Sequence, residues 1–450
     1  MVKCFVLDTN IILSGASSLL GFDDNHVILT GTTPQELDSK KKLSGEIGYN
    51  AREAVRILDV LRERGNLRTG VVLDNGGVLS IEPNGVRENL LPDGYSLDVP
   101  DNRILSTCLY LNDQQRAQGL GDVILVTNDV SMRVNAAILG LRVEGYRNEQ
   151  IESSDYTGHK LVEAAPEALD VLYRDGRLET DEYSAGLFEN QFVTFRCGQA
   201  SALTVYRNGA FYVIREQKTF GGTKPLNAMQ SYAIWALKAP ASEIPLVILT
   251  GCAGTAKTFL SLAVGMEYTY NVAEGKGMYN KILLSRPNGV GFSNIGFLPG
   301  DLDRKLSPLM ASYYDNMEIL MNNYGKMKES REQIQQRMND ILETGVVELC
   351  SLDFIRGRSL QETYIICDEA QNATRGLIRD VVSRAGYNSK VIVLGDPWQI
   401  DLPQLDKKTN GLVYAAEAMK GSKYAAVLHL DSRYSVRSAL AKEAIERMRF

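Results

Sequence analysis

Short apolar runs and helical patterns alternate along the first part of the chain. The runs predicted as strands are residues 2–7, 27–30 and 123–127, and the helical patterns are residues 52–64 and 131–139. Strands that alternate with amphipathic helices usually pair into a parallel sheet covered by those helices. Residues 1–150 are therefore predicted to form one α/β domain.

The pattern changes between residues 151 and 222. Short strand-like runs follow one another at residues 192–195, 202–206 and 211–215. Asn208-Gly209, between the last two runs, is a strong signal for a two-residue hairpin turn. This stretch predicts a small β-rich module that links the two halves of the chain.

The α/β alternation returns after Gly221-Gly222 and continues to the end, which predicts a second α/β domain over residues 223–450. Within it, residues 315–345 are rich in Met, Asn, Gln and Glu at helical spacing and predict an exposed helical excursion. More than one core is expected in a chain of 450 residues, because domains usually contain about 100 to 200 residues.

Composition narrows the class of protein without naming a function. The chain is 44% hydrophobic and 23% charged, with a net charge of −6, which is ordinary for a globular protein in water. The six cysteines are scattered and predict reduced core residues, and the three histidines are too far apart in the sequence to suggest zinc. Asp8 and Asn10 interrupt the apolar start, so we expect no export signal, no membrane span and a cytoplasmic location.

A nucleotide-binding loop is predicted where the apolar run at residues 246–250 leads through a glycine-containing loop into an apolar helix, which is the context of a P-loop. Loop N–H groups and the helix start would hold the α- and β-phosphates of ATP, Lys257 would reach the β- and γ-phosphates, and Thr258 would hold Mg²⁺. The residues expected to bind the nucleotide are Gly251, Gly254, Thr255, Ala256, Lys257 and Thr258.

Ala256 departs from the usual pattern, which has glycine before the lysine. If the backbone at this position has a positive φ, alanine costs about 1 kcal/mol or more of strain. That strain would weaken nucleotide binding without abolishing it. A glycine-rich turn that binds nothing is the alternative for the loop taken alone.

Two further apolar runs predict strands that end in polar residues. The first ends in Asp368-Glu369, where Asp368 is expected to hold the water shell of Mg²⁺ and Glu369 to polarise the attacking water. The second ends before Gln399, whose side chain could sense the γ-phosphate. Gln230 lies where superfamily 1 helicases carry a glutamine that reads adenine, although such a glutamine alone is more often a surface residue.

Residues 223–445 resemble the PhoH family of P-loop ATPases. The matching segments are Lys224-Pro-Leu-Asn227 with Gln230, the P-loop, Ser285-Arg-Pro, Gly296-Phe-Leu-Pro-Gly-Asp301, Asp368-Glu-Ala-Gln-Asn372, Ser389-Lys390 and Gly395-Asp-Pro-Trp-Gln-Ile-Asp-Leu402. Arg437-Ser438 resembles a late Arg-Ser element of that family. The resemblance implies that Arg437 could act as an arginine finger in trans within a ring of subunits. Ala256 and the helical excursion are the departures from the family pattern.

Four acids in the first domain are predicted at strand ends and helix starts. Asp8 follows the first strand, Glu36 lies in the first turn of a helix that Thr33-Pro34 would begin as N-cap and N1, Asp101 follows Pro100, and Asp129 follows a further strand. Carboxylates that share a crevice raise one another's pKa, and a Mg²⁺ or Mn²⁺ ion would relieve this. Metal-activated water attacking a phosphodiester is the chemistry indicated. Taken singly, each acid is more often a helix cap or a solvated charge.

Residues 1–147 resemble a PIN nuclease domain. The matching segments are Asp8-Thr-Asn10, Glu36-Leu-Asp38 with Lys40 to Lys42, Ala51-Arg-Glu-Ala54, Asp101-Asn-Arg-Ile-Leu105 and Val126-Thr-Asn-Asp129. The resemblance implies that Asp8, Glu36, Asp101 and Asp129 bind the metal, with Asp38, Asp98 and Asp122 near enough in sequence to be confused with them. The lysine run is equally well explained as a solvated surface or as a contact to RNA phosphate.

Together the two resemblances are similar to the PIN–PhoH fusion proteins. They imply an ATP-dependent RNA helicase coupled to a Mg²⁺-dependent endoribonuclease, acting as a homo-oligomer in a hexameric ring through which RNA is threaded. The alternative is a toxin-like ribonuclease whose ATPase domain drives assembly or regulation, with a small antitoxin-like partner. A binding module that no longer cleaves is disfavoured by the presence of all four acids, and nothing in the sequence suggests a small-molecule phosphotransferase.

Overall fold

A computed structural model describes most of the chain. The described residues are 2–43, 45–146, 156–269, 277–287, 302–324, 330–355, 358–402, 405–407, 409–431, 433, 443 and 447. They form two compact units, Met1–Gln150 and Ile151–Phe450.

The first unit is built on a mostly parallel sheet, as the sequence predicted. Its described strands have the order β3-β4-β2-β1-β5-β6, and β3 alone among them is antiparallel to its neighbour. The strands are β1 Cys4–Leu7, β2 His26–Thr30, β3 Val71–Val72, β4 Val78–Glu82, β5 Ile124–Val126 and β6 Arg142–Glu144. The helices are α1 Thr9–Ser14, α2 Thr33–Lys40, α3 Gly45–Arg64, α4 Pro100–Ala117 and α5 Val130–Ile138.

Helices bury both faces of this sheet. Along β1, Phe5 and Leu7 belong to the core that α1 and α3 cover, whereas Val6 belongs to the core that α4 and α5 cover. This period-two division is what a strand covered on both sides requires. It places β1 in the middle of the sheet, so that its last residue opens onto the edge where parallel strands end.

The β-rich module has its own sheet, in the order β7-β9-β10-β11-β8. Its elements are β7 His159–Glu163, α6 Pro166–Asp175, β8 Arg177–Glu179, β9 Gln191–Cys197, β10 Ala200–Arg207 and β11 Ala210–Val213. The predicted hairpin turn is confirmed, because Asn208 and Gly209 have φ of 48° and 78° and join the paired residues Arg207 and Ala210.

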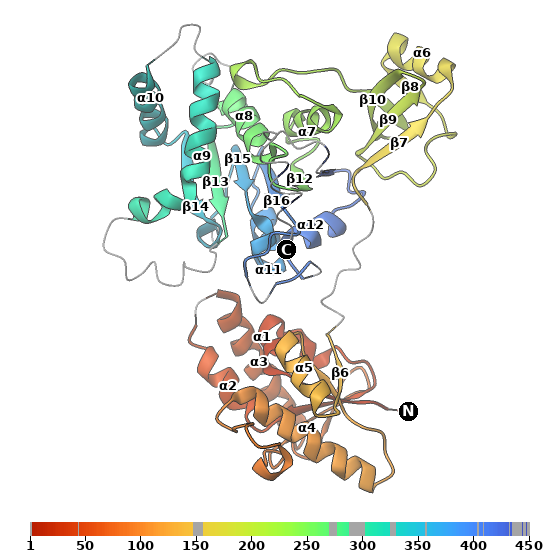
Figure 1. Cartoon of the computed structure of the whole chain (residues 1–450), viewed down its shortest axis with the longest axis vertical. Helices are drawn as coiled ribbons and strands as arrows, with labels where there is room; N and C mark the ends of the chain where they lie inside the picture. The colour runs from red at the N-terminus through yellow and green to blue at the C-terminus, as the bar shows by residue number, and fades with distance from the viewer. Residues whose placement is uncertain are drawn as a thin grey trace. The chain divides into compact units, whose positions relative to one another are not determined.

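The large sheet of the second unit is parallel, with the order β14-β13-β15-β16-β12-β17 (Figure 1). Its strands are β12 Leu246–Gly251, β13 Lys281–Arg286, β14 Val347–Ser351, β15 Thr363–Cys367, β16 Lys390–Gly395 and β17 Ala425–Leu430. The helices are α7 Ala228–Lys238, α8 Lys257–Thr269, α9 Leu302–Tyr324, α10 Arg331–Glu343, α11 Arg375–Ser383 and α12 Gly411–Ala418. Residues of β12, β15 and β16 point alternately into two cores, one under α7 to α10 and one under α11 and α12.

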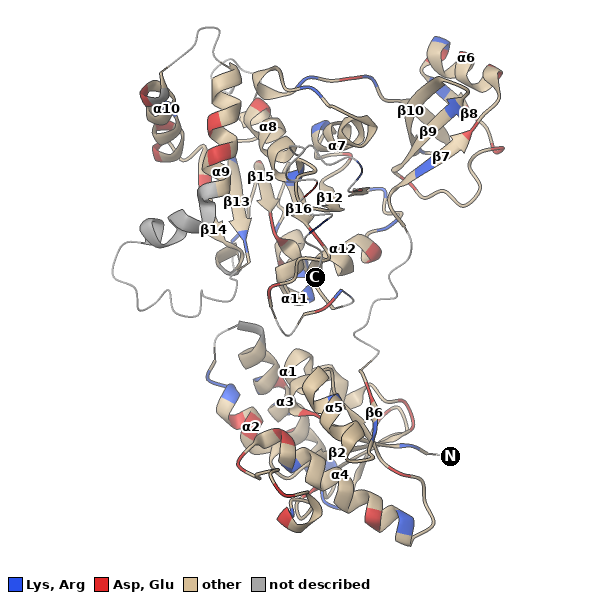
Figure 2. Ribbon diagram, in the orientation of Figure 1, with Lys and Arg blue, Asp and Glu red and all other residues tan. Residues whose placement is uncertain are grey.

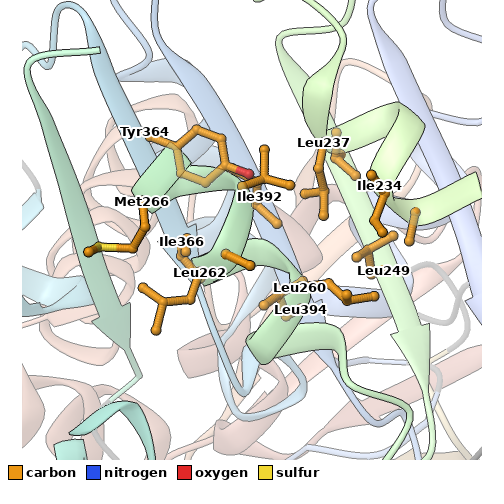
Figure 3. Packing of buried hydrophobic residues seen from close by; sticks show 14 of the residues in the cluster. Ile234, Leu237, Leu249, Leu260, Leu262, Met266, Tyr364, Ile366, Ile392 and Leu394 are labelled. Carbon is orange, nitrogen blue, oxygen red and sulfur yellow. The ribbon is translucent and has the colours of Figure 1, made fainter. Parts of the chain in front are cut away.

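Figure 3 shows part of the first of these cores, in which Ile234 and Leu237 of α7 and Leu260 of α8 pack over Leu249 and Leu394 of the sheet. The helix α8 is buried on several sides, since Leu260, Leu262 and Met266 are each at most 1% exposed. A helix enclosed in this way holds its first turn rigidly, and that first turn carries Lys257.

The structure corrects several sequence predictions. The helical excursion at residues 315–345 is not simply exposed, because Met317, Leu320, Ile334 and Met338 belong to the main core. The strands β3, β4 and β6 were not predicted. The prediction of core cysteines holds for Cys108, Cys350 and Cys367, which are buried, whereas Cys4, Cys197 and Cys252 are only partly buried. Among the described residues, no helix is both long and apolar enough to cross a membrane.

Lysine and arginine are mixed with aspartate and glutamate over the described elements of both units (Figure 2). A balanced surface of this kind agrees with the modest net charge of −6. Overall charge therefore says little about a nucleic-acid partner, and the sites have to be judged from their own geometry.

Candidate active sites

The P-loop connects β12 to α8 and contains three residues with a positive φ. Gly251 has a φ of 140°, and a Cβ there would lie 2.1 Å from the carbonyl oxygen of Leu430 on β17. Gly254 has a φ of 83° and Ala256 a φ of 67°. The sequence-based concern about Ala256 is therefore correct, since alanine in this region carries a strain of about 1–2 kcal/mol.

Lys257 is directed back into the loop. Its ammonium donates hydrogen bonds to the carbonyl oxygens of Gly251 at 2.7 Å and Cys252 at 3.0 Å. The residue is only 8% exposed, and this burial lowers the pKa of the ammonium, while the nearby charge of Asp368 opposes the shift. A buried cation at the start of a helix is matched to an anionic ligand such as a phosphate.

Thr258 and Asp368 meet beside the loop. The Thr258 hydroxyl donates to Oδ2 of Asp368 at 2.9 Å, although the two residues are 110 positions apart. Asp368 is buried and its backbone N–H bonds to Ser285 on the neighbouring strand β13. A hydroxyl and a carboxylate held together at the carboxyl end of a parallel sheet are oxygen donors of the kind that Mg²⁺ prefers.

Glu369 is held by two side chains that the sequence did not assign to the site. Arg286 donates to Oε1 at 2.9 Å, and the amide of Gln371 donates to Oε2 at 2.5 Å. The backbone of Glu369 is left-handed, with a φ of 54°. The Arg286 guanidinium also lies 5.6 Å from the ring centre of Tyr313, so α9 reaches this site.

The remaining predicted nucleotide-site residues differ in their settings. Gln230 is buried rather than on the surface, and its side-chain oxygen accepts from the backbone N–H of Leu226 at 2.8 Å. Gln399 is exposed, and its backbone makes two hydrogen bonds: its oxygen accepts from Gln371 and its N–H donates to the Asp396 carbonyl. Arg437 and the predicted Gly296 to Asp301 segment lie outside the described residues.

Three of the four predicted acids of the first unit influence one another. Asp8 is 1% exposed, and burial raises its pKa, with smaller contributions from the charges of Asp101 and Asp129. Burial and the Asp129 charge also raise the pKa of Asp101. Asp8 accepts from the hydroxyl of Thr127 at 2.7 Å.

The fold explains why these three acids approach each other. The strands β1 and β5 are parallel neighbours, so Asp8 and Asp129 follow their carboxyl ends at one edge of the sheet. Both are also helix N-caps, Asp8 for α1 and Asp129 for α5. Asp101 lies in the first turn of α4. Helix N-termini stabilise negative charge, so the local structure supports an acidic cluster.

Glu36 lies in the first turn of α2 as predicted, but the helix is capped by Thr32 rather than Thr33, without a side-chain cap bond. Its Oε1 is buried and has no hydrogen-bond partner. Within the part of the chain that is described, no three His, Cys, Asp or Glu side chains are placed so that they could hold one metal ion. An unpartnered carboxylate oxygen and an all-oxygen donor set nevertheless suit Mg²⁺ or Mn²⁺ chemically.

The fold and both sites define a chain with a nuclease-type α/β unit followed by a P-loop ATPase. Family comparison agrees: residues 5–147 match the PIN domain and residues 223–449 match the family described as PhoH-like protein. The chain belongs to the PhoH family and carries a PIN domain at its N-terminal end.

Proteins named PhoH2 resemble this chain over nearly its full length. The one from Bacillus subtilis is 35% identical over 432 residues, which cover 94% of this chain and 94% of that protein. Those from Thermobispora bispora and Mycolicibacterium smegmatis are 31% and 30% identical, and each covers 98% of this chain and 95% of its own length.

Proposed function

We propose that this protein is an ATP-dependent RNA helicase coupled to a metal-dependent endoribonuclease, so that it unwinds and cleaves RNA. The observation that carries the proposal is the hydrogen bond between Thr258 and Asp368 next to Lys257, in a chain that also has acids clustered around Asp8 in a separate unit. Two independent sets of carboxylates suit two hydrolytic reactions.

In the ATPase unit, each side chain would have a role set by its position relative to the bound nucleotide. The P-loop N–H groups and Lys257 would bind the phosphates, whereas Thr258 and Asp368 would hold the Mg²⁺ that accompanies ATP. Bound Mg²⁺ would offset the charge of the transferring phosphoryl group. Glu369 would orient the attacking water, and the ion pair with Arg286 would hold its carboxylate in position.

In the PIN unit, Asp8, Glu36, Asp101 and Asp129 would hold Mg²⁺ or Mn²⁺. The metal would supply an activated water for attack on a phosphodiester. Burial holds Asp8 in place, with Thr127 donating to one oxygen and the Asn10 N–H to the other. Lys40 and Lys42 are exposed and follow Glu36 closely in the sequence, and they would contact the phosphates of the RNA backbone.

The proposed assembly is a homohexameric ring through which RNA is threaded, and in it Arg437 completes the ATP site of a neighbouring subunit. The second candidate is a toxin-like ribonuclease regulated by its ATPase unit and by a small antitoxin-like partner, in the cytoplasm as for the first. The two candidates differ in whether ATP hydrolysis is needed to cleave duplex RNA.

The decisive experiment uses Lys257→Ala and Asp8→Asn proteins with single-stranded and duplex RNA, with and without ATP and Mg²⁺. We expect Lys257→Ala to lose ATP hydrolysis and duplex cleavage while it still cuts single strands. Asp8→Asn should lose all cleavage but keep ATP hydrolysis and strand separation. Duplex cleavage that survives in Lys257→Ala would favour the regulated ribonuclease, and loss of single-strand cleavage in that folded variant would refute the two-site account.

A further inference from the structure

The Gln371 side chain connects the glutamate of the ATPase site to a neighbouring loop. It is fully buried, and its Nε2 donates to Oε2 of Glu369 at 2.5 Å and to the backbone oxygen of Gln399 at 2.9 Å. Its Oε1 accepts from the backbone N–H of Asp396 at 3.1 Å. One side-chain amide thus uses both of its donor hydrogens and its acceptor oxygen to join Glu369 to the loop that contains Asp396 and Gln399.

The segment on the other side of Gln371 follows β16. Its backbone turns sharply, because the N–H of Trp398 donates to Oδ1 of Asp396 at 3.0 Å and the N–H of Gln399 donates to the Asp396 carbonyl at 3.1 Å. Trp398 lies at the exposed tip and is 65% exposed, with the Lys407 ammonium 3.0 Å from its ring centre. The Asp396–Gln399 loop is therefore hydrogen-bonded to the buried Gln371 and exposes the indole of Trp398 to solvent.

Gly395 shows that the amide of Gln371 is closely fitted. A Cβ at Gly395 would lie 2.2 Å from Oε1 of Gln371, closer than any side chain permits. A side chain at Gly395 would therefore displace the Gln371 amide from its present position. The close fit leaves the amide little room to rotate away from Glu369 without moving the loop as well.

We propose that Gln371 is a positioning residue that couples Glu369 to the Asp396–Gln399 loop, so that the nucleotide state of the ATPase site and the position of Trp398 change together. The inference rests on the proposed ATP hydrolysis, in which Glu369 orients the attacking water. Gln371 touches neither ATP nor water in this account and acts only through Glu369. Arg286 holds the other carboxylate oxygen.

The test compares Gln371→Leu with the parent. Loss of a hydrogen bond to a charged group should lower kcat for ATP hydrolysis roughly 10- to 100-fold, while KM for ATP stays within about threefold because the P-loop contacts remain. Gln371→Glu keeps the length and the acceptor but loses both donor hydrogen bonds, so it should lose kcat to a similar or greater extent. A second variant of this kind keeps the test informative if the leucine protein does not fold.

Asn372 provides a matched control. Its side chain makes a reciprocal pair with Asp401, donating to Oδ2 at 3.0 Å and accepting from the Asp401 N–H at 2.7 Å. Only its backbone N–H bonds to Glu369, at the carbonyl oxygen, and a side-chain substitution leaves that bond in place. Asn372→Leu therefore perturbs the same stretch of chain without releasing Glu369. We expect it to reduce the melting temperature while kcat changes less than threefold.

Trp398 gives a readout that a purely structural role would not move. The chain has two tryptophans, so in a Trp235→Phe background the fluorescence comes from Trp398. Adding Mg²⁺ with the non-hydrolysable analogue AMP-PNP should shift that emission in the parent background and leave it unchanged with Gln371→Leu. Equal shifts in both proteins, or equal losses of kcat in the Gln371 and Asn372 variants, would overturn the coupling. If the parent itself shows no Lys257-dependent ATP hydrolysis, the proposed function fails instead.

Discussion

The acidic cluster of the PIN unit can be tested through the stability of that unit, independently of catalysis. Asp8→Asn removes a charge with almost no change in volume, and the amide can still accept from the Asn10 N–H and bond to the Thr127 hydroxyl. Burial raises the native pKa of Asp8 above 3.8. The Asp8 carboxyl therefore loses its proton at a lower pH in the unfolded chain than in the native state. As pH rises from below 3.8 through the raised native pKa, the free energy of unfolding falls. The variant should gain stability at pH 7, and the gain should vanish at low pH.

Metal binding gives the larger and more specific effect. Mn²⁺ at roughly 100 times its dissociation constant would stabilise the native protein by about 2.7 kcal/mol. For a unit of this size, 1 kcal/mol corresponds to about 2–4 °C, so the parent should gain about 5–11 °C from the metal. If the missing charge weakens binding tenfold, Asp8→Asn loses about 1.4 kcal/mol of that gain. RNA cleavage should fall on the order of 100-fold or more, because metal-activated water and charge stabilisation are lost together.

The assay separates the two units because both tryptophans, Trp235 and Trp398, lie in the second unit. Calorimetry follows both melting transitions, whereas tryptophan fluorescence follows only the ATPase unit and serves as the internal control. Mn²⁺ should raise the melting temperature of the PIN unit, whose transition appears in calorimetry but not in tryptophan fluorescence. If Asp8 is only a helix cap, Asp8→Asn will melt at a lower temperature than the parent, with the same Mn²⁺ response and unchanged cleavage. That result would end the nuclease assignment.

Three further predictions concern the second unit. Ala256→Gly relieves strain of about 1 kcal/mol but adds freedom to the unfolded chain, so calorimetric titration should show ATP binding equal to or tighter than in the parent; tenfold weaker binding would contradict the strained-loop interpretation. Burial lowers the pKa of His159 to about 4, so urea unfolding should show a loss of about 1–2 kcal/mol between pH 6.5 and 4, and His159→Gln should abolish this slope. Lys390 donates to three buried backbone oxygens at 2.6–2.9 Å, so Lys390→Met should cost about 3–5 kcal/mol in the same assay; a loss below 1 kcal/mol would show that those oxygens find other donors.

The positions that sequence predicted well are those where a local pattern determines the geometry. An apolar run followed by an acid predicts a strand end, and parallel strands end at one edge, so the sequence places Asp8 and Asp129 at one edge, and likewise the P-loop and Asp368. Their close approach also depends on the strand order, which the sequence did not give. The left-handed backbone at Ala256 was likewise foreseeable, because the loop type demands it.

Residues that act through tertiary contacts were harder to predict. The strand β3 is only two residues long and pairs antiparallel with β4, so neither its length nor its period distinguishes it from a turn. Nothing in the sequence indicates that Gln230 is buried. Its side chain is held inside by a hydrogen bond from the backbone N–H of Leu226. Gln371 lay inside a matched motif, but only its three hydrogen bonds show what it holds.

The β-rich module, predicted as a linker, belongs to the same compact unit as the ATPase domain. Its Asn190 donates to the backbone oxygens of Ser422, Lys423 and Ala425 just before and at the start of β17. The chain approaching the module also bonds to β17, since the His429 N–H donates to the carbonyl of Thr157 at 2.8 Å. Because β17 pairs with β12, which leads into the P-loop, the module is attached one strand away from the phosphate site. A shift of β17 on nucleotide binding would therefore be passed first to the module, through which the chain continues toward the PIN unit.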